Sequence, residues 1–239
     1  MPVFIDNIGH MRYAIYYAPR ESNALWRAGC QWLGRDPLLK TMLEQPDVPG
    51  LDAQTLSEST APPRRYGFHA TLKPPFALAE TETLEKLFAA LSVFARSRNA
   101  FRLPPLEVGN LGGFLALRVS RPCKELNMLA DDCVSEFDRF RRQPTRSELA
   151  RRRRGLDARQ RALLERWGYP YVMDQWRFHM TLTGPVNREQ AEMMAGFLND
   201  WFREALCEPL WVEDLCVFIE TEAGGEFRLG ARFPLARTA

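Results

Sequence analysis

The sequence predicts an α+β fold with two pseudo-symmetric lobes, each an antiparallel sheet backed by helices, and a cleft between the lobes. Short apolar strands bounded by Gly and Pro alternate with amphipathic helical stretches. Two nearly identical segments, FHATL at 68–72 and FHMTL at 178–182, lie in the two halves of the chain. At 239 residues and 46% hydrophobic composition, the chain is long enough for one bilobed domain spanning 1–239.

The first elements are inferred from local composition. After about ten residues that look like a loose leader, residues 12–19 form a predicted strand rich in Tyr and Ile. Ser22 is the predicted N-cap of a helix. The stretch 45–63, rich in Pro, Asp, Ser and Thr, is expected to be an ordered loop or a mobile flap. It leads into the first histidine strand at 65–72, which the prolines at 74–75 are expected to end.

The middle of the chain predicts helix, hairpin and helix. Apolar residues at helical spacing predict a helix over 81–98. Two strands at 101–108 and 114–119 flank a Gly-rich turn at 109–113, which is typical of a β-hairpin. A second amphipathic helix is expected over 122–142.

The C-terminal half repeats this theme. The second histidine strand lies within residues 176–185. Asn187, followed by Gln three residues later, predicts a helix that begins with a capping box. Two final strands at 211–220 and 226–234 flank a short Gly-containing turn. Because the two halves have similar orders of elements, the two histidine strands are expected to lie side by side or to face each other across the cleft.

Composition excludes several classes of protein. The 32 basic and 30 acidic residues leave a formal net charge of +2, which gives no global electrostatic case for nucleic acid. Five cysteines form no C-x-x-C pair, so reduced thiols are expected. No signal-peptide pattern and no apolar run of membrane length is present, so we expect a cytoplasmic protein without membrane contact. Nucleotide-loop, dinucleotide, zinc-protease and serine-hydrolase motifs are absent, and we expect neither a metal nor a cofactor.

Two His-x-Thr pairs are the feature that carries chemistry. Side chains at i and i+2 of a strand point the same way, so each His lies beside its Thr. One neutral imidazole can remove a proton from an attacking oxygen while a charged one protonates the leaving oxygen. The hydroxyls can donate hydrogen bonds to phosphate oxygens. A lone His on an apolar strand is usually structural, but the duplication favours catalysis or phosphate binding; the third histidine, His10, is expected at the surface.

With their flanking residues, the two motifs resemble a known family. The frames RYGFHATLKPPF (65–76) and WRFHMTLTGP (176–185) are similar to the two-histidine phosphoesterase superfamily, in particular to a DUF1045-like branch associated with bacterial phosphonate-utilisation operons. The likeness covers most of the chain, including RYAIYYAP near the N-terminus and LLERWGYP at 163–170.

The resemblance implies roles for four residues. The two histidines would form the acid/base pair and the two threonines would hold phosphate oxygens: His69, His179, Thr71 and Thr181. Three neighbours extend the same alternation and are substrate-binding candidates: Lys73, Arg177 and Thr183. For each of these three, a solvated charge or a structural role is the alternative.

The Arg-rich helical segment 139–168 holds the other notable pattern. Eleven arginines fall between residues 139 and 166, and they could bind a polyanion such as RNA. The same segment also predicts a helix that begins after Asp157 and turns Leu163 and Leu164 inward, so a solvated helical face explains most of it.

The sequence thus favours metal-independent hydrolysis of a small cyclic phosphodiester, and the resemblance implies a ribose cyclic phosphate of phosphonate metabolism. A 2′,3′-cyclic nucleotide or RNA-end phosphodiesterase, or a ligase, stays open and would be favoured if the Arg-rich helices bordered the cleft. A binding module that holds a nucleotide or phosphate without turnover is the alternative of another class. The expected partner is a small phosphorylated molecule; the oligomeric state and the choice of acid and base are left open.

Overall fold

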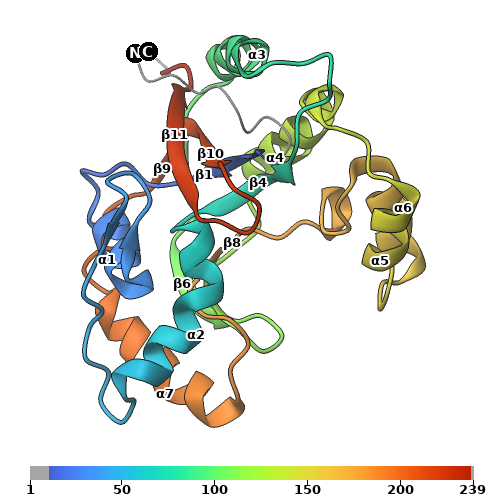
Figure 1. Ribbon diagram of the computed structural model, residues 1–239. Coiled ribbons are helices and arrows are strands. Elements are labelled where there is room, and N and C mark those ends of the chain that lie inside the picture. Colours follow the sequence, from blue (N-terminus) through green and yellow to red (C-terminus); the bar gives the residue numbers. More distant parts are fainter. Residues whose placement is uncertain (1–10, 238–239) are drawn as a thin grey trace.

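The computed structural model describes residues 11–237, which form one central antiparallel sheet with helices around it (Figure 1). Seven strands follow the order β11-β10-β1-β4-β8-β7-β6. The leader and His10 fall outside the described residues. Over residues 11–237, no helix combines the length and the apolar character needed to cross a membrane.

The strands of the large sheet come from both halves of the chain. They are β1 (Arg12–Tyr17), β4 (Ala70–Phe76), β6 (Leu106–Asn110), β7 (Leu115–Val119), β8 (His179–Thr181), β10 (Asp214–Glu220) and β11 (Phe227–Pro234). Two short antiparallel pairs accompany it: β2 (Arg35–Asp36) with β3 (Thr41–Met42), and β5 (Phe101–Arg102) with β9 (Trp211–Val212).

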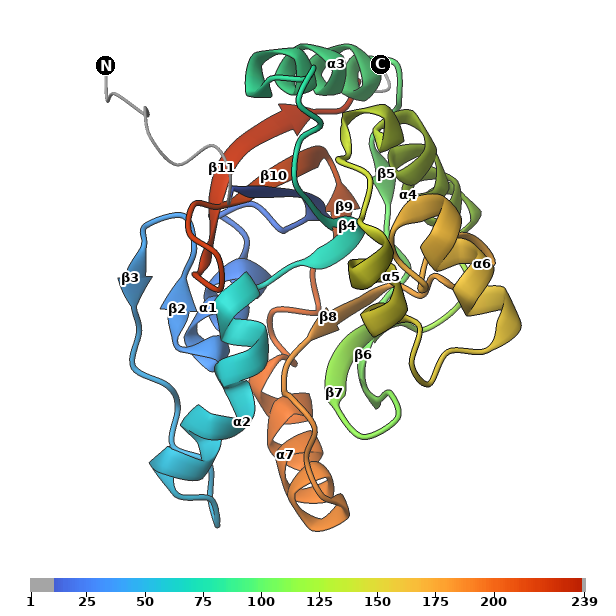
Figure 2. The ribbon, with the colours of Figure 1, turned by 45° about the vertical axis from the view of Figure 1, so that its right-hand side comes forward.

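The helices surround this sheet in three groups. They are α1 (Ala24–Leu33), α2 (Ala53–Tyr66), α3 (Leu84–Arg96), α4 (Lys124–Glu136), α5 (Arg146–Arg152), α6 (Ala158–Trp167) and α7 (Arg188–Trp201), with 3-10 turns at Asp138–Phe140 and Met173–Gln175. In both views α3 lies at the β10–β11 end, α7 lies at the opposite end, and the pair α5 and α6 stands to one side (Figures 1 and 2).

The predicted α+β fold with antiparallel sheets backed by helices is confirmed, and the two half-sheets are joined edge to edge. β4 pairs with β8 through Ala70 and Met180, so the two histidine strands lie side by side (Figure 2). The indole Nε1 of Trp176 donates to the carbonyl of Thr71 at 2.8 Å across this seam. The duplication therefore brings the two motifs together inside one continuous sheet.

The stretch 45–63 is not a loop throughout, because its second part is helix α2. Asp52 caps this helix by accepting a hydrogen bond from the Thr55 backbone N–H. Pro63 lacks an N–H and leaves the carbonyl of Ser59 without its helical partner. The backbone N–H of Gly184 donates to that carbonyl at 2.6 Å, so the helix tolerates the proline.

The prolines at 74–75 do not end the first histidine strand, which runs from Ala70 to Phe76 and starts later than predicted. The pairing of β1 with β4 shifts register on both sides of Ile15. Where the pairing of two strands is irregular, some backbone N–H groups have no cross-strand carbonyl to bind. The prolines, which lack an N–H, lie in that irregular part of β4.

Several boundaries also differ from the sequence prediction. The helix-capping residue before α1 is Asn23 rather than Ser22, and its side chain accepts from the Leu25 backbone. The helix expected over 122–142 ends at Glu136. The capping box at Asn187 is confirmed. All five cysteines are unpaired, and four of them are buried.

Candidate active site

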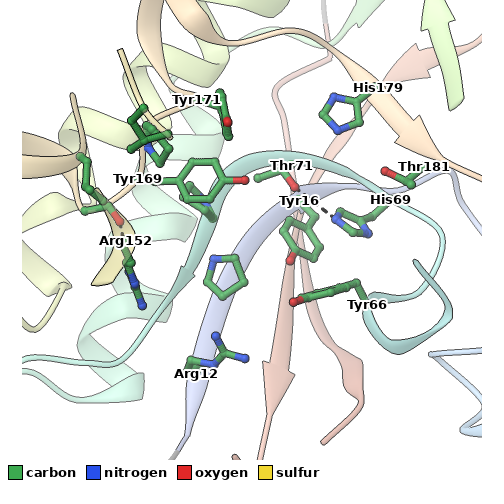
Figure 3. Close-up of a pocket in the computed structure, with 16 residues that line it drawn as sticks. Arg12, Tyr16, Tyr66, His69, Thr71, Arg152, Tyr169, Tyr171, His179 and Thr181 are labelled. Carbon is green, nitrogen blue, oxygen red and sulfur yellow. Dashed lines mark hydrogen bonds between the residues drawn. The ribbon is translucent and has the colours of Figure 1, made fainter. Parts of the chain in front are cut away.

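The two His-x-Thr pairs line one cavity of about 560 Å³ at the seam between β4 and β8 (Figure 3). The four predicted residues His69, Thr71, His179 and Thr181 are all half-buried at its wall. The apolar residues between them are buried on the other side of the strands, as the period of two requires. The structure therefore brings together the four residues that the repeated motif singled out.

Both histidines are held in the same way. The Nδ1–H of His69 donates to the carbonyl of Gly67 at 2.8 Å, and that of His179 donates to the carbonyl of Arg177 at 2.8 Å. Because a carbonyl can only accept, Nδ1 carries the proton in each ring and Nε2 is the nitrogen left for chemistry. The Nε2 of His69 lies 3.2 Å from the Thr71 hydroxyl. The two rings are therefore oriented by the same kind of backbone hydrogen bond.

Aromatic rings surround His69 and set its charge. Tyr16 stacks on the imidazole with ring centroids 3.6 Å apart, and Tyr66 and Phe218 lie at 6.4 and 6.0 Å. Burial, with a smaller contribution from the neighbouring His179, lowers the pKa of His69 to about 3, although the hydrogen bond to Gly67 opposes the change. His69 is therefore neutral near pH 7 and can accept a proton.

Lys73 does not reach the cavity, although strand alternation predicted that it would. β4 has an extra residue between Thr71, which pairs with Tyr16, and Lys73. Lys73 pairs with Ile15, which faces the other side of the sheet from Tyr16. The side chain is 1% exposed, donates to a backbone carbonyl of α4 and lies 3.6 Å from Asp138. Burial lowers the pKa of Lys73 to about 8, and the Asp138 charge opposes this.

The other two binding candidates also lie outside this cavity. The guanidinium of Arg177 donates to the carbonyls of Asp174 and Trp176 at 2.9 and 2.7 Å. The hydroxyl of Thr183 is buried and accepts from the Leu115 backbone at 2.9 Å. Thr183 borders a smaller, apolar cavity of about 270 Å³ that His69 shares. Both side chains therefore have backbone partners.

The sequence interpretation missed the residues that complete the cavity wall. β1 and the end of α2 contribute Arg12, Tyr16 and Tyr66, and the α5–α6 region contributes Arg152, Tyr169 and Tyr171. Arg12 and Tyr16 are four residues apart on one strand, which places them on one face. That face becomes a site only because β1 pairs with β4, and local sequence carries no signal for this pairing.

The Arg-rich segment borders the cavity, but many of its charges are matched. Asp157 caps α6 as predicted, and Leu163 and Leu164 are buried. Arg152 lines the cavity. Other guanidiniums pair with nearby carboxylates: Arg139 with Glu136, Arg141 with Asp138, Arg142 with Glu148, Arg153 with Glu165 and Arg159 with Asp174. The solvated helical face predicted for this segment accounts for the exposed arginines of the helices, whereas Arg141 is buried next to the 3-10 turn Asp138–Phe140.

Within residues 11–237, no group of three or more His, Cys, Asp or Glu side chains is placed to hold a metal ion.

Known proteins resemble this chain over most of its length. A family described as "Protein of unknown function (DUF1045)" matches residues 71–228. The ribose 1,5-bisphosphate phosphokinase PhnN of Janthinobacterium sp. (strain Marseille) is 40% identical over 230 residues, covering 94% of this chain and 51% of that protein. The PhnN of Laribacter hongkongensis (strain HLHK9) is 37% identical over 219 residues, covering 92% and 50%.

The chain spans about half the length of these curated relatives. A solved structure described as "Crystal structure of phosphoesterase" aligns with 95% of this chain and 99% of that chain. Its sequence identity is 13% and its TM-score is 0.44.

Proposed function

The chain belongs to the DUF1045 family, and we propose that it hydrolyses a small cyclic phosphodiester by two-histidine general acid/base catalysis. The observation that carries the proposal is the matched geometry of the two histidines. Both rings bind a backbone carbonyl through Nδ1 and line the same cavity, and the Nε2 of His69 contacts the Thr71 hydroxyl. A resemblance to the two-histidine phosphoesterases supports the same chemistry.

We propose His69 as the base, because its lowered pKa keeps the imidazole neutral near pH 7, and His179 as the acid. Neutral His69 accepts a proton at Nε2 from a water molecule, whose oxygen forms a bond to phosphorus. His179, protonated at Nε2, gives its proton to the ester oxygen as the P–O bond breaks. Thr71 and Thr181 donate hydrogen bonds to the non-bridging oxygens, where negative charge develops. The proton removed from water and the proton given to the leaving oxygen balance over one cycle.

We propose a ribose cyclic phosphate of phosphonate metabolism as the substrate. The relatives named above are called ribose 1,5-bisphosphate phosphokinases. Hydrolysis of the 1,2-cyclic phosphate of ribose 5-phosphate, with cleavage of the bond between phosphorus and the C2 oxygen, yields ribose 1,5-bisphosphate. The proposed reaction therefore makes the compound that appears in the relatives' names.

The test is turnover by the purified chain in the presence of EDTA. Ribose 5-phosphate 1,2-cyclic phosphate and 2′,3′-cyclic nucleotides are incubated with the protein, and products are identified by phosphorus NMR. We expect ribose 1,5-bisphosphate from the first compound and a loss of about 10³-fold in kcat for His69→Ala and for His179→Ala. Binding without turnover would instead indicate a binding module. Activity that EDTA abolishes, or that survives either substitution, would contradict the two-histidine mechanism.

A 2′,3′-cyclic nucleotide or RNA-end phosphodiesterase is the second candidate. It is favoured by one observation, the position of Arg152 and the Arg-rich helices at the border of the cavity. A basic track for RNA would make binding fall steeply with added salt. Because many of these arginines are already paired with carboxylates, we expect a shallow salt dependence with an RNA oligomer. A steep slope together with faster turnover of 2′,3′-cyclic nucleotides would favour the RNA substrate.

A further inference from the structure

The cavity continues beyond the two His-Thr pairs to a positively charged end. In Figure 3, Arg12 and Arg152 lie on the side of the cavity away from His179 and Thr181. Among the described residues that line the cavity, none is Asp or Glu. An anionic group is therefore favoured here over a neutral or cationic one.

A shared carboxylate leaves this end with an unbalanced charge. Glu220 is fully buried and forms ion pairs with both Arg12 and Arg65. Two guanidiniums and one carboxylate sum to one excess positive charge. Arg12 lines the cavity, whereas Arg65 does not. The excess positive charge is therefore exposed to the cavity at the Arg12 guanidinium.

The guanidinium of Arg12 is held in a fixed orientation. Its Nε and Nη2 both donate to the Glu220 carboxylate, the latter at 2.7 Å, and its carbon lies 5.4 Å from the centre of the Phe227 ring. This arrangement leaves Nη1 as the nitrogen not bound to Glu220. A planar, preorganised guanidinium suits the recognition of phosphate oxygens.

Tyrosine hydroxyls supply further donors between this charge and the histidines. Tyr16 and Tyr169 line the cavity. In Figure 3, Tyr169 lies between Arg152 and the His-Thr pairs, and Tyr16 lies between Arg12 and His69. Burial raises the pKa of both hydroxyls, so they stay protonated and able to donate near pH 7. Arg152 faces the same space from α5, and its Nη1 donates to the carbonyl of Gly168 at 3.3 Å.

We propose that this end of the cavity is a binding site for a phosphomonoester that the substrate carries in addition to its cyclic phosphate, with Arg12 as the main contact. The inference rests on the proposed hydrolysis of a cyclic phosphodiester. It restricts the substrate to doubly phosphorylated molecules, such as a cyclic phosphate of a sugar phosphate, and it separates them from cyclic phosphates that have only a hydroxyl at that position.

The first experiment compares two substrates that differ by one phosphate. Ribose 5-phosphate 1,2-cyclic phosphate and ribose 1,2-cyclic phosphate are assayed with the wild type and with Arg12→Gln. We expect the wild type to favour the first substrate in kcat/KM, and Arg12→Gln to reduce this preference about 10- to 100-fold, because one charge-assisted hydrogen-bond contact is lost.

Arg65→Gln is the matched control for Arg12→Gln. It removes an equivalent ion pair with Glu220 but no residue of the cavity wall. Because Arg65→Gln also removes the excess charge but keeps the Arg12 contact, we expect a clearly smaller reduction of the preference than in Arg12→Gln. In the same way Arg152→Gln is compared with Arg153→Gln, since Arg153 pairs with Glu165 outside the cavity, and only the former should reduce the preference. Equal hydrolysis of both substrates by the wild type, or an equal loss in Arg12→Gln and Arg65→Gln, would overturn the proposal.

A binding measurement keeps this test separate from the reaction. Ribose 5-phosphate, which has no cyclic phosphate, is titrated into each protein by calorimetry, with ribose as the neutral reference. We expect binding that is weakened at least tenfold in Arg12→Gln and clearly less in Arg65→Gln. If neither cyclic phosphate is hydrolysed, the proposed function fails while this result still decides the binding site. No binding of ribose 5-phosphate to the wild type, or equal loss in both variants, would overturn the site.

Discussion

At the scale of single residues, the ring of Tyr16 determines what His69 can do. The stacked ring at 3.6 Å, together with Tyr66 and Phe218, removes water from the imidazole. Desolvation disfavours the charged form, so the pKa falls to about 3. His179 has an edge contact with Phe114 at 5.8 Å and no comparable stack. One base and one acid can thus arise from two similar sequence motifs.

The pH dependence of kcat/KM tests this assignment. Because His69 gains its proton only near pH 3, its loss as a base should not reduce the wild-type rate between pH 5 and 7. Tyr16→Ala admits water and should move the pKa of His69 toward about 6.5, so that kcat/KM falls about tenfold or more from pH 7 to pH 5. Tyr16→Phe keeps the stacked ring, so the acid side of its pH profile should match that of the wild type. A wild-type acid limb near pH 6.5 would contradict the assignment.

Lys73 predicts a different pH effect, on stability. Its pKa is about 8 in the fold and about 10.4 in an unfolded chain, so the unfolded state binds more protons between these values and stability rises with pH there. Below pH 8 the buried charge costs about 3 kcal/mol. Lys73→Met should therefore be at least as stable as the wild type at pH 7, and this advantage should shrink from pH 8 to 10.5. Urea denaturation at each pH measures it.

The same substitution tests the role of Lys73 in binding. Because Lys73 lies on the other face of β4, its replacement by Met should leave KM within about twofold of the wild-type value. A large increase in KM would show that the ammonium contacts the substrate after all.

The four motif residues could be predicted from sequence because their signal is local and repeated. His69 lies directly before β4 and Thr71 is two positions on, ahead of the irregular part of the strand, and His179 and Thr181 have the same spacing in β8. Lys73 could not be placed, since the extra residue in β4 depends on pairing with β1. Alternation gives the face of a side chain only while the ladder stays regular.

At the scale of elements, the link between α2 and β4 positions His69, the proposed catalytic base. Gly67 ends α2 with φ 79° and ψ 174°, a conformation that is accessible almost only to glycine. Its carbonyl accepts the Nδ1–H of His69. A Cβ at this position would lie 2.8 Å from the Pro37 ring. The glycine is therefore required by backbone conformation, by space and by the orientation of His69.

Gly67→Ala should reduce both stability and catalysis. The strained backbone and the contact with Pro37 should lower the free energy of unfolding by about 2 kcal/mol. Movement of the carbonyl should lower kcat more than it raises KM. Gly224→Ala is the control, since Gly224 has φ 84° and open space around it, so backbone strain alone should cost about 1 kcal/mol. Equal effects on kcat from both variants would contradict a positioning role for Gly67.

Elements with complete local signals were predicted and others were not. The capping boxes at Asp157 and Asn187 each involve only four consecutive residues, and both helices begin there. Helix α2 was not predicted, because its prolines and polar residues are typical of a loop. Its stability depends on a hydrogen bond from Gly184, more than 100 residues away, which no local pattern reveals.

At the scale of the whole molecule, two half-sheets, β11-β10-β1-β4 and β8-β7-β6, meet along one narrow seam, and each contains strands from both halves of the chain. β4 and β8 share the register pair of Ala70 and Met180, and Trp176 donates to the carbonyl of Thr71 across the seam. The repeat predicted that the motifs would be neighbours, but it did not distinguish one joined sheet from two facing sheets. Edge pairing is settled by long-range hydrogen bonds, which the repeated sequence does not specify. Each proposed catalytic group therefore belongs to a different half-sheet.

This arrangement predicts strong coupling between the two histidines. If His69 takes a proton from water while His179 gives one to the leaving oxygen, either histidine alone accelerates the reaction only slightly. His69→Ala and His179→Ala should each lower kcat by about 10³-fold, and the double variant should be no more than about tenfold slower than either. His69→Ala combined with Arg177→Ala is the control, because the Arg177 guanidinium contacts loop carbonyls, and these two effects should add. Single-turnover rates are measured for the three single and the two double variants; fully additive losses for the two histidines would mean that they act in separate steps.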